Sequence, residues 1–201
     1  MPLNLPRPIS YAITSGATTA KTTPDDPEFA AVLRWVEAAV AAQVSLIQIR
    51  EKLMSVRVLY ELARRAAAIT LHTPTKLLIN DRFDIVRAAG ADGVHLTTNS
   101  LPANLVREIC GQDFLIGVST HSLETAQSAA EAGADFIVFG PVFETESKRA
   151  FGPPQGLEKL REVSNALAGF PVLAIGGINA ANADECLSAG ASGIAGISLF
   201  Q

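Results

Sequence analysis

Short apolar runs recur along the whole chain and alternate with longer segments of mixed polarity. Most of the runs are continuous rather than alternating in polarity, which is typical of parallel strands that are covered on their outer face. Eight of them are predicted as strands: Ile9 to Thr14, Val44 to Arg50, Lys76 to Asn80, Gly93 to Leu96, Phe114 to Val118, Phe136 to Phe139, Val172 to Ile175 and Gly193 to Ser198.

The segments between these strands space their apolar residues at three and four, which predicts amphipathic helices. Asp25 or Asp26 and Ser55 stand where the first two helices need N-caps, and a further helix should start near Arg82. The predicted helices are Pro27 to Ala42, Val56 to Ile69, Leu101 to Cys110, Ser122 to Ala132, Leu157 to Leu167 and Ala180 to Ala189.

A repeated phrase joins helix to strand at three places: AGADGVHL from Ala89, AGADFIVFG from Ala132 and AGASGIAGIS from Ala189. Each Ala-Gly ends a helix, with the glycine as a left-handed C-cap, and an apolar strand follows directly. Strands and helices that alternate in this way indicate right-handed parallel crossovers, and eight strands close a barrel. We predict an α/β chain with one (β/α)8 TIM-barrel domain over residues 1–201, and an open doubly wound sheet is the alternative.

The sequence stops at Gln201, directly after the eighth predicted strand, so the last helix of the expected barrel is missing. Helices cover the outside of such a barrel, and the first and last strands would lack part of that cover. We expect self-association near this gap, which would make the protein a homo-oligomer.

Composition and charge exclude several kinds of partner. The net charge is −4 and no block of Lys and Arg occurs, so we expect no nucleic-acid partner. The N-terminus has no signal-like segment and no apolar run reaches membrane-spanning length, so we expect a soluble, cytoplasmic protein without a membrane partner. Cys110 and Cys186 are too few for a disulfide framework and are predicted as buried thiols.

Polar side chains gather where the predicted strands end, which is where TIM barrels carry their sites. Alternation along the second strand puts Gln48, Arg50 and Lys52 on one face and Ile47 and Ile49 on the other. The polar residues after the other strands are Thr14, Ser15, Asn80, Asp81, Arg82, His95, Thr97, Thr98, Asn99, Ser100, Ser119, Thr120, His121, Thr145, Ser147, Lys148 and Ser198.

This end of the barrel is cationic and rich in hydroxyl groups, which fits a phosphate-bearing ligand. Arg50, Lys52 and Lys148 supply charge, while hydroxyl groups and glycine N–H groups supply directed donors. Gly176 and Gly177 resemble the phosphate site that often follows the seventh strand, although they could also be turn glycines.

Three further residues of this end have two interpretations each. Asp81 beside Asn80 could hold a Mg²⁺ ion that bridges a diphosphate, or it could cap the next helix. His121 follows two hydroxyl residues and is a candidate acid/base or ligand contact. His95 is either part of the site or a histidine packed at the end of its strand.

Six motifs occur in the order in which one enzyme superfamily carries them: LIQIREK (Leu46 to Lys52), LLINDR (Leu77 to Arg82), GADGVHL (Gly90 to Leu96), GVSTHS (Gly117 to Ser122), FGPVFETESK (Phe139 to Lys148) and AIGGIN (Ala174 to Asn179). Through these motifs the chain resembles the thiamine phosphate synthase and thiazole tautomerase superfamily from about Tyr11 to its last residue. The resemblance implies a TIM barrel that joins hydroxymethylpyrimidine diphosphate to thiazole phosphate and releases diphosphate with the help of Mg²⁺.

The resemblance also implies a role for each matching residue. The diphosphate of the pyrimidine substrate would be bound by Gln48, Arg50, Lys52, Asn80 and Lys148, and Mg²⁺ by Asp81. Other substrate contacts would come from Ser119, Thr145 and Ser147, and the thiazole phosphate would be received near Gly176, Gly177 and Ser198. The residues that we assign to catalysis are Arg50, Lys52, His121 and Lys148.

The chain departs from the synthase pattern after the fourth strand. Ser100 stands where synthases have the acidic residue that is the second Mg²⁺ ligand, and a hydroxyl is a weaker ligand, so metal affinity should fall. The first strand ends in Thr14-Ser15 where the family usually shows Thr-Asp. Phe143 to Glu146 is more similar to the tautomerase branch, in which a histidine at the position of His121 is the acid/base. A synthase-type transferase is our first prediction, and a tautomerase-like isomerase or a phosphate-binding barrel without turnover are the alternatives.

Overall fold

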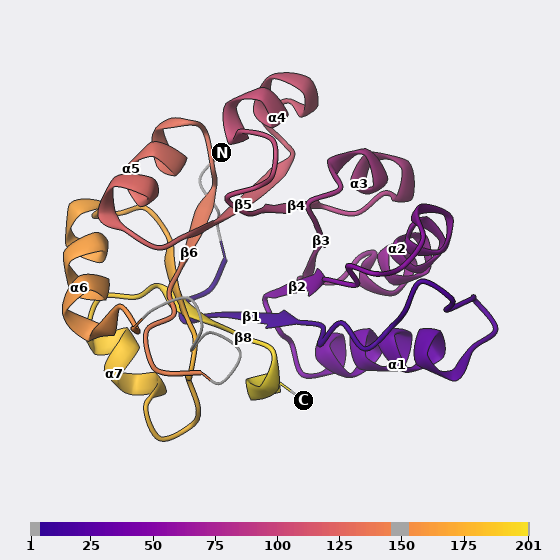
Figure 1. Cartoon of the computed structure of the whole chain (residues 1–201), viewed down its shortest axis with the longest axis horizontal. Coiled ribbons are helices and arrows are strands. Elements are labelled where there is room, and N and C mark those ends of the chain that lie inside the picture. The colour runs from indigo at the N-terminus through magenta and orange to yellow at the C-terminus, as the bar shows by residue number, and fades with distance from the viewer. Residues whose placement is uncertain (1–4, 146–152, 201) are drawn as a thin grey trace.

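The computed structural model describes residues 5–145 and 153–200, and its eight parallel strands close into a barrel surrounded by helices (Figure 1). Each strand pairs with the next along the chain, and the last strand pairs with the first. The strands are β1 (Ile9–Ile13), β2 (Leu46–Ile49), β3 (Lys76–Asn80), β4 (Gly93–Leu96), β5 (Leu115–Thr120), β6 (Phe136–Phe139), β7 (Val172–Ile175) and β8 (Gly193–Gly196). The predicted TIM barrel is confirmed, and the open-sheet alternative is wrong.

The helices follow the predicted order, and apart from the start of α7 the predicted ends lie within two residues of the observed ones. The helices of the described residues are α1 (Pro27–Ala41), α2 (Val56–Thr70), α3 (Phe83–Ala89), α4 (Ala103–Cys110), α5 (Leu123–Glu131), α6 (Gly156–Ala166) and α7 (Ala183–Ser188). α3 is the helix that was expected to start near Arg82, and it is only seven residues long. α7 starts three residues later than predicted, because the side chains of Asn179 and Asn182 bond to backbone N–H groups and hold a turn there.

The three Ala-Gly joints have the predicted geometry. Gly90, Gly133 and Gly190 follow the ends of α3, α5 and α7 with φ angles of 75°, 89° and 98°. Glycine adopts these left-handed conformations at little energetic cost because it has no Cβ atom. Each helix therefore ends at its glycine, and the next strand begins shortly afterwards.

Successive residues of β1 and β2 belong to different apolar cores. Tyr11, Leu46 and Phe136 pack together inside the barrel. Ala12 and Ile47 instead pack between the strands and the surrounding helices. Both faces of the sheet are therefore covered, which explains the continuous apolar runs in the sequence.

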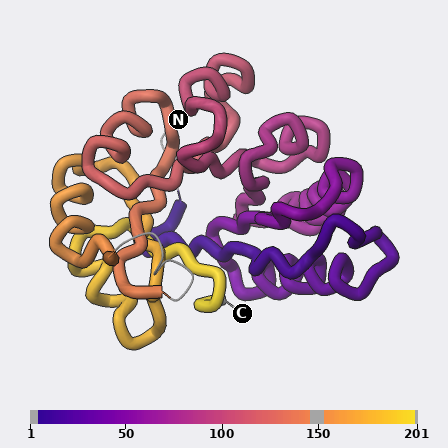
Figure 2. The backbone as a smooth tube through the Cα atoms, viewed as in Figure 1, coloured from indigo at the N-terminus to yellow at the C-terminus, as the bar shows by residue number. Residues whose placement is uncertain are grey.

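The first and last strands lie side by side in the middle of the molecule, drawn in indigo and yellow in Figure 2. After β8 the chain forms a short 3-10 helix, η2 (Ser198–Phe200), which lies between α7 and α1 in the view of Figure 1 and contacts β1. Self-association near this position stays a prediction. None of the helices in the described part of the chain is long and apolar enough to span a membrane.

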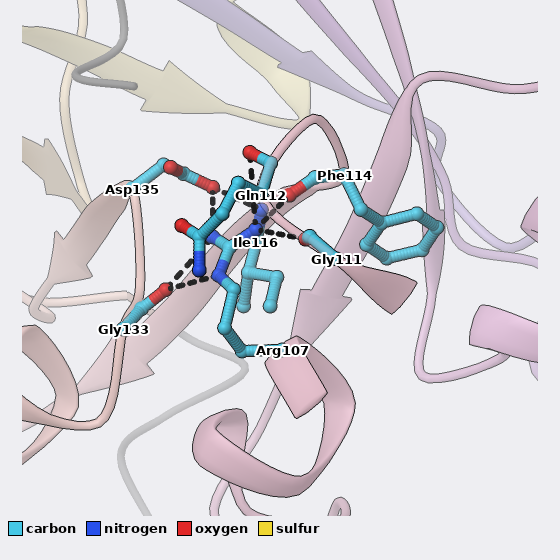
Figure 3. Close-up of polar contacts among 7 residues, drawn as sticks. All are labelled: Arg107, Gly111, Gln112, Phe114, Ile116, Gly133 and Asp135. Atoms are coloured by element: carbon cyan, nitrogen blue, oxygen red, sulfur yellow. Dashed lines mark hydrogen bonds and ion pairs between the residues drawn. The ribbon is translucent and has the colours of Figure 1, made fainter. Parts of the chain in front are cut away.

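The side chain of Arg107 bonds to several backbone groups of the segment between α4 and β5, at the amino end of the barrel (Figure 3). The Arg107 guanidinium donates to the carbonyl oxygens of Gly111 and Gly133, each at 2.8 Å, and to that of Phe114. It also forms an ion pair of 2.7 Å with Asp135, which in turn accepts from the backbone N–H of Ile116. A single side chain thus joins α4 to the loops before β5 and β6.

The two cysteine thiols differ in accessibility, and this difference can be measured. Cys186 is fully buried, as predicted, whereas Cys110 is only half-buried. Burial and the neighbouring charge of Glu185 raise the pKa of Cys186 to about 11, so it holds little thiolate at pH 8. We expect a disulfide reagent at pH 8 to label Cys110 in the folded protein and both cysteines after unfolding. Equal labelling rates for the two thiols in the folded protein would contradict this.

Candidate active site

The polar face of β2 lies inside the barrel near its carboxyl end. Gln48 is almost fully buried, and its Nε2 donates to Oδ1 of Asn80 on β3 at 3.0 Å. Arg50 follows directly after β2 and its backbone N–H donates to Oγ1 of Thr14, which joins the ends of β1 and β2. The strand ends at Ile49, so the predicted alternation applies to Gln48 but not to Arg50 and Lys52, which follow the strand, and Lys52 lies in an exposed turn.

A chain of hydrogen bonds crosses the barrel interior from β1 to β5. The Tyr11 hydroxyl lies 3.1 Å from Nδ1 of His95, and Nε2 of His95 lies 2.8 Å from Oγ of Ser119. Burial raises the pKa of Tyr11 well above its ordinary value. Burial and, to a lesser extent, the charge of Arg50 lower the pKa of His95 to about 3, so the ring is neutral at physiological pH. His95 is therefore both packed and hydrogen-bonded to a predicted site residue.

The sequence patterns do not single out Tyr11 or Glu51 as site residues. Both form hydrogen bonds with residues near this end of the barrel. The signal for Tyr11 is its interior position in β1 between two apolar residues of the same face. Glu51 is buried directly after Arg50, and one carboxylate oxygen accepts from the backbone N–H and the hydroxyl of Thr18 at 3.1 and 2.6 Å. Its other oxygen has no hydrogen-bond partner within the described residues. Glu51 thus anchors the loop after β1 against the end of β2.

Asp81 directly follows β3 and has a left-handed backbone conformation. Its φ angle is +64°, a costly conformation for a residue other than glycine, and its backbone N–H donates to the carbonyl oxygen of His95. The N-cap position of α3 is Arg82, so the capping interpretation of Asp81 is wrong. Arg82 pairs with Asp84, and Asp81 is exposed.

Asp81 is the candidate Mg²⁺ ligand of this barrel end, with substrate phosphate oxygens as the source of further ligands. Within residues 5–145 and 153–200 there is no cluster of three or more His, Cys, Asp or Glu that would hold a metal alone. The Ser100 hydroxyl accepts from the backbone N–H of Thr97 at 2.7 Å and lies 3.1 Å from its Oγ1, so it closes a turn after β4. Mg²⁺ is commonly held by one or two carboxylates together with substrate phosphates, and Asp81 supplies one such carboxylate.

The loops after β6 and β7 approach each other so closely that only glycine fits between them. A Cβ atom on Gly176 would lie 2.5 Å from Cβ of Pro141, and one on Gly177 would lie 2.6 Å from the carbonyl oxygen of Glu144. The adjacent Thr145 hydroxyl is buried and has no hydrogen-bond partner among the described residues. Gly176 and Gly177 thus have a packing role, and their N–H groups remain candidates for phosphate binding. Ser147 and Lys148 lie outside the described residues.

His121 and Ser198 lie at the same end of the barrel but are exposed to solvent. His121 directly follows β5, and its Nδ1 donates to the carbonyl oxygen of Gly140 at the end of β6. Because a carbonyl group can only accept, the neutral ring carries its lone pair on Nε2. Ser198 is the first residue of η2, after β8.

Hydrogen bonds and strand order thus bring Gln48, Arg50, Asn80 and Ser119 together around the interior of one barrel end. Asp81, Thr145, Gly177 and His121 lie in loops around them at the same end, since they follow parallel strands. The opposite end carries a hollow of about 450 Å³ lined partly by Lys76 and Asp92, which form an ion pair. That hollow lies at the amino ends of the strands, where TIM barrels carry residues for stability.

Residues 19–200 match the protein family described as thiamine monophosphate synthase. The chain belongs to this family. A protein of Geobacter sulfurreducens is 48% identical over 167 residues, which cover 83% of this chain and 78% of that protein. A thiamine-phosphate synthase of Clostridium novyi is 42% identical over 163 residues, 81% of this chain and 79% of that protein. The thiamine phosphate pyrophosphorylase from Pyrococcus furiosus has a TM-score of 0.79 at 34% identity and covers 94% of this chain and 85% of its own.

Membership in the thiamine monophosphate synthase family confirms the resemblance that the six motifs carry. It also agrees with the barrel, since the Pyrococcus furiosus protein has the same fold over almost the whole chain. Most of the residues that this chain places at the carboxyl end of the barrel, among them Gln48, Asn80 and Ser119, belong to the stretches of those motifs. Ser100, the predicted departure from the synthase pattern, has its hydroxyl bonded to Thr97 in a turn.

Proposed function

We propose that this protein is a thiamine-phosphate synthase that joins hydroxymethylpyrimidine diphosphate to thiazole phosphate. The observation that carries the proposal is the gathering of Gln48, Arg50, Asn80 and Ser119 inside one end of the barrel, with Asp81 at its edge. This set combines one fixed positive charge, amide groups, a hydroxyl group and a carboxylate, which suits a diphosphate attached to a polar ring. We expect the enzyme to act in the cytoplasm.

The reaction exchanges one bond for another. The C–O bond between the pyrimidine methylene group and the diphosphate breaks, and the diphosphate leaves with the electron pair. The thiazole nitrogen then donates its lone pair to the cationic methylene carbon and forms the new C–N bond. Arg50 stabilises the charge that develops on the departing diphosphate, and Lys52 and Lys148 are proposed to assist it. No nucleophilic side chain is required.

A Mg²⁺ ion bound with the substrate would neutralise part of the diphosphate charge. Asp81 is the carboxylate that we assign to it. The left-handed backbone of Asp81 keeps this side chain exposed directly after β3, beside the strand that carries His95. Because Asp81 is the single acidic residue proposed for the metal, the protein should bind Mg²⁺ weakly before the diphosphate arrives.

The proposal is tested by mixing the purified chain with hydroxymethylpyrimidine diphosphate, thiazole phosphate and Mg²⁺. We expect thiamine phosphate, detected as fluorescent thiochrome phosphate after oxidation, together with one diphosphate per product. Reactions that lack either substrate should give no thiamine phosphate. Absence of product with both substrates at millimolar concentration would refute the proposal.

A second candidate activity rests on His121. Its Nδ1–H donates to Gly140, so the free lone pair on Nε2 is available as a base at the barrel end. A thiazole tautomerase would use such a base to move a proton on carboxythiazole phosphate without metal. Offering the tautomer alone in the presence of EDTA separates the two activities. Proton exchange into the thiazole with no thiamine phosphate in the first assay would favour the isomerase.

Replacing Ser100 with aspartate should strengthen metal binding. The new carboxylate adds a second acidic ligand candidate at the position where synthases carry one, so we expect the affinity for Mn²⁺, used as a probe for Mg²⁺, to rise about tenfold or more. Electron paramagnetic resonance of free Mn²⁺ measures this without turnover. Asn99→Asp is the matched control because it adds the same charge one residue away. Equal gains in both variants would mean a general charge effect instead of ligation.

A further inference from the structure

The hydrogen bonds of Tyr11, His95 and Ser119 have a direction that follows from what each group can donate. The Tyr11 hydroxyl carries one proton, and within the described residues the only hydrogen-bond partner of this group is Nδ1 of His95. Tyr11 is fully buried, so its hydroxyl is not exposed to bulk solvent. A Tyr11 proton that did not point at Nδ1 would therefore have no acceptor among the described residues.

Only one neutral form of His95 meets this requirement. If Tyr11 donates to Nδ1, the ring proton lies on Nε2, and Nε2–H donates to Oγ of Ser119 at 2.8 Å. In the other form, Nδ1–H would point at the Tyr11 oxygen and the Tyr11 proton would be unpaired. Leaving a buried donor unpaired disfavours that form by about tenfold or more. A doubly protonated ring would also carry a proton on Nδ1, so it would leave the Tyr11 proton unpaired in the same way.

We propose that Tyr11 and His95 are positioning residues that fix the Ser119 hydroxyl as a hydrogen-bond donor to the substrate. The Ser119 oxygen accepts from Nε2–H, and its own proton has no acceptor among the described residues. Ser119 is half-buried at the carboxyl end of β5, so this proton is available to an acceptor atom of a ligand. A ring nitrogen or a phosphate oxygen has the required lone pair. That the ligand is the pyrimidine diphosphate rests on the proposed function, whereas the direction of the hydroxyl does not.

The tautomer of His95 can be observed directly by nitrogen NMR on the full chain labelled with ¹⁵N-histidine. The chain contains three histidines, and the exposed His72 and His121 are assigned through His72→Gln and His121→Gln, which leaves His95. We expect at pH 7.5 a protonated Nε2 and an unprotonated Nδ1. A proton on Nδ1, or on both nitrogens, would overturn the proposal whether or not the chain makes thiamine phosphate.

A double-mutant cycle tests whether Tyr11 acts through Ser119. Ser119→Ala should lower kcat/KM by about 10- to 100-fold, and Tyr11→Phe by about fivefold, because the hydroxyl then loses its fixed direction. In the Ser119→Ala background, Tyr11→Phe should change kcat/KM by less than twofold. The same loss in both backgrounds would mean that Tyr11 only supports the fold, and would overturn the positioning role. If no thiamine phosphate forms at all, the proposed function fails, and the NMR result still decides the direction of the hydroxyl.

Discussion

Replacing Arg50 with methionine should lower kcat/KM for thiamine phosphate formation by about 10² to 10³. Arg50 follows β2 at the carboxyl end, and its charge reaches His95 inside the barrel. Within residues 5–145 and 153–200 it forms no ion pair with a carboxylate, so its charge is available to an anion. Methionine keeps much of the volume and removes the charge. Steady-state kinetics with varied pyrimidine diphosphate measures the loss.

The control for this variant is Arg34→Met on the exposed surface of α1. It removes the same charge far from the strand ends and should leave kcat/KM within twofold of the unmodified protein. Both variants should unfold at nearly the same temperature as the parent, which separates lost chemistry from lost structure. A loss below threefold in Arg50→Met would remove Arg50 from the proposed mechanism.

The barrel could be predicted because its signals are local. Continuous apolar runs mark strands that are covered on both faces, and the glycines of the Ala-Gly joints mark helix ends by their left-handed backbone. Because all eight strands are parallel, the residues that follow each strand lie at the same end of the barrel. Gln48 and Asn80, 32 residues apart, are hydrogen-bonded for this reason.

The remaining features depend on contacts that the local pattern does not contain. Lys52 leaves the strand direction because β2 ends at Ile49 and a turn follows. The role of Tyr11 requires knowing that His95 reaches it across the barrel from 84 residues away. Ser100 matches a ligand position in the sequence pattern, yet its hydroxyl is already bonded to Thr97. Side-chain direction in these loops is set by hydrogen bonds rather than by strand periodicity.

Replacing Arg107 with methionine should destabilise the fold by about 3 to 5 kcal/mol, because it leaves Asp135 as a buried carboxylate without its partner. The side chains of this ion pair are only 11% and 10% exposed. The variant also removes the donors to the carbonyl oxygens of Gly111, Phe114 and Gly133 (Figure 3). We expect the thermal midpoint to fall by about 10 °C for a chain of this size, measured by circular dichroism.

Arg64→Met is the matched control, because Arg64 also pairs with a carboxylate, that of Glu61, but its side chain is 52% exposed. Water replaces a lost partner at such a site, so the midpoint should stay within about 2 °C of the parent. Asp135→Asn in the Arg107→Met background should recover part of the loss, since a neutral amide no longer leaves an unpaired charge buried and its oxygen can still accept from Ile116. If the double variant were as unstable as Arg107→Met alone, the loss of stability would come from the three carbonyl contacts and not from the unpaired carboxylate of Asp135.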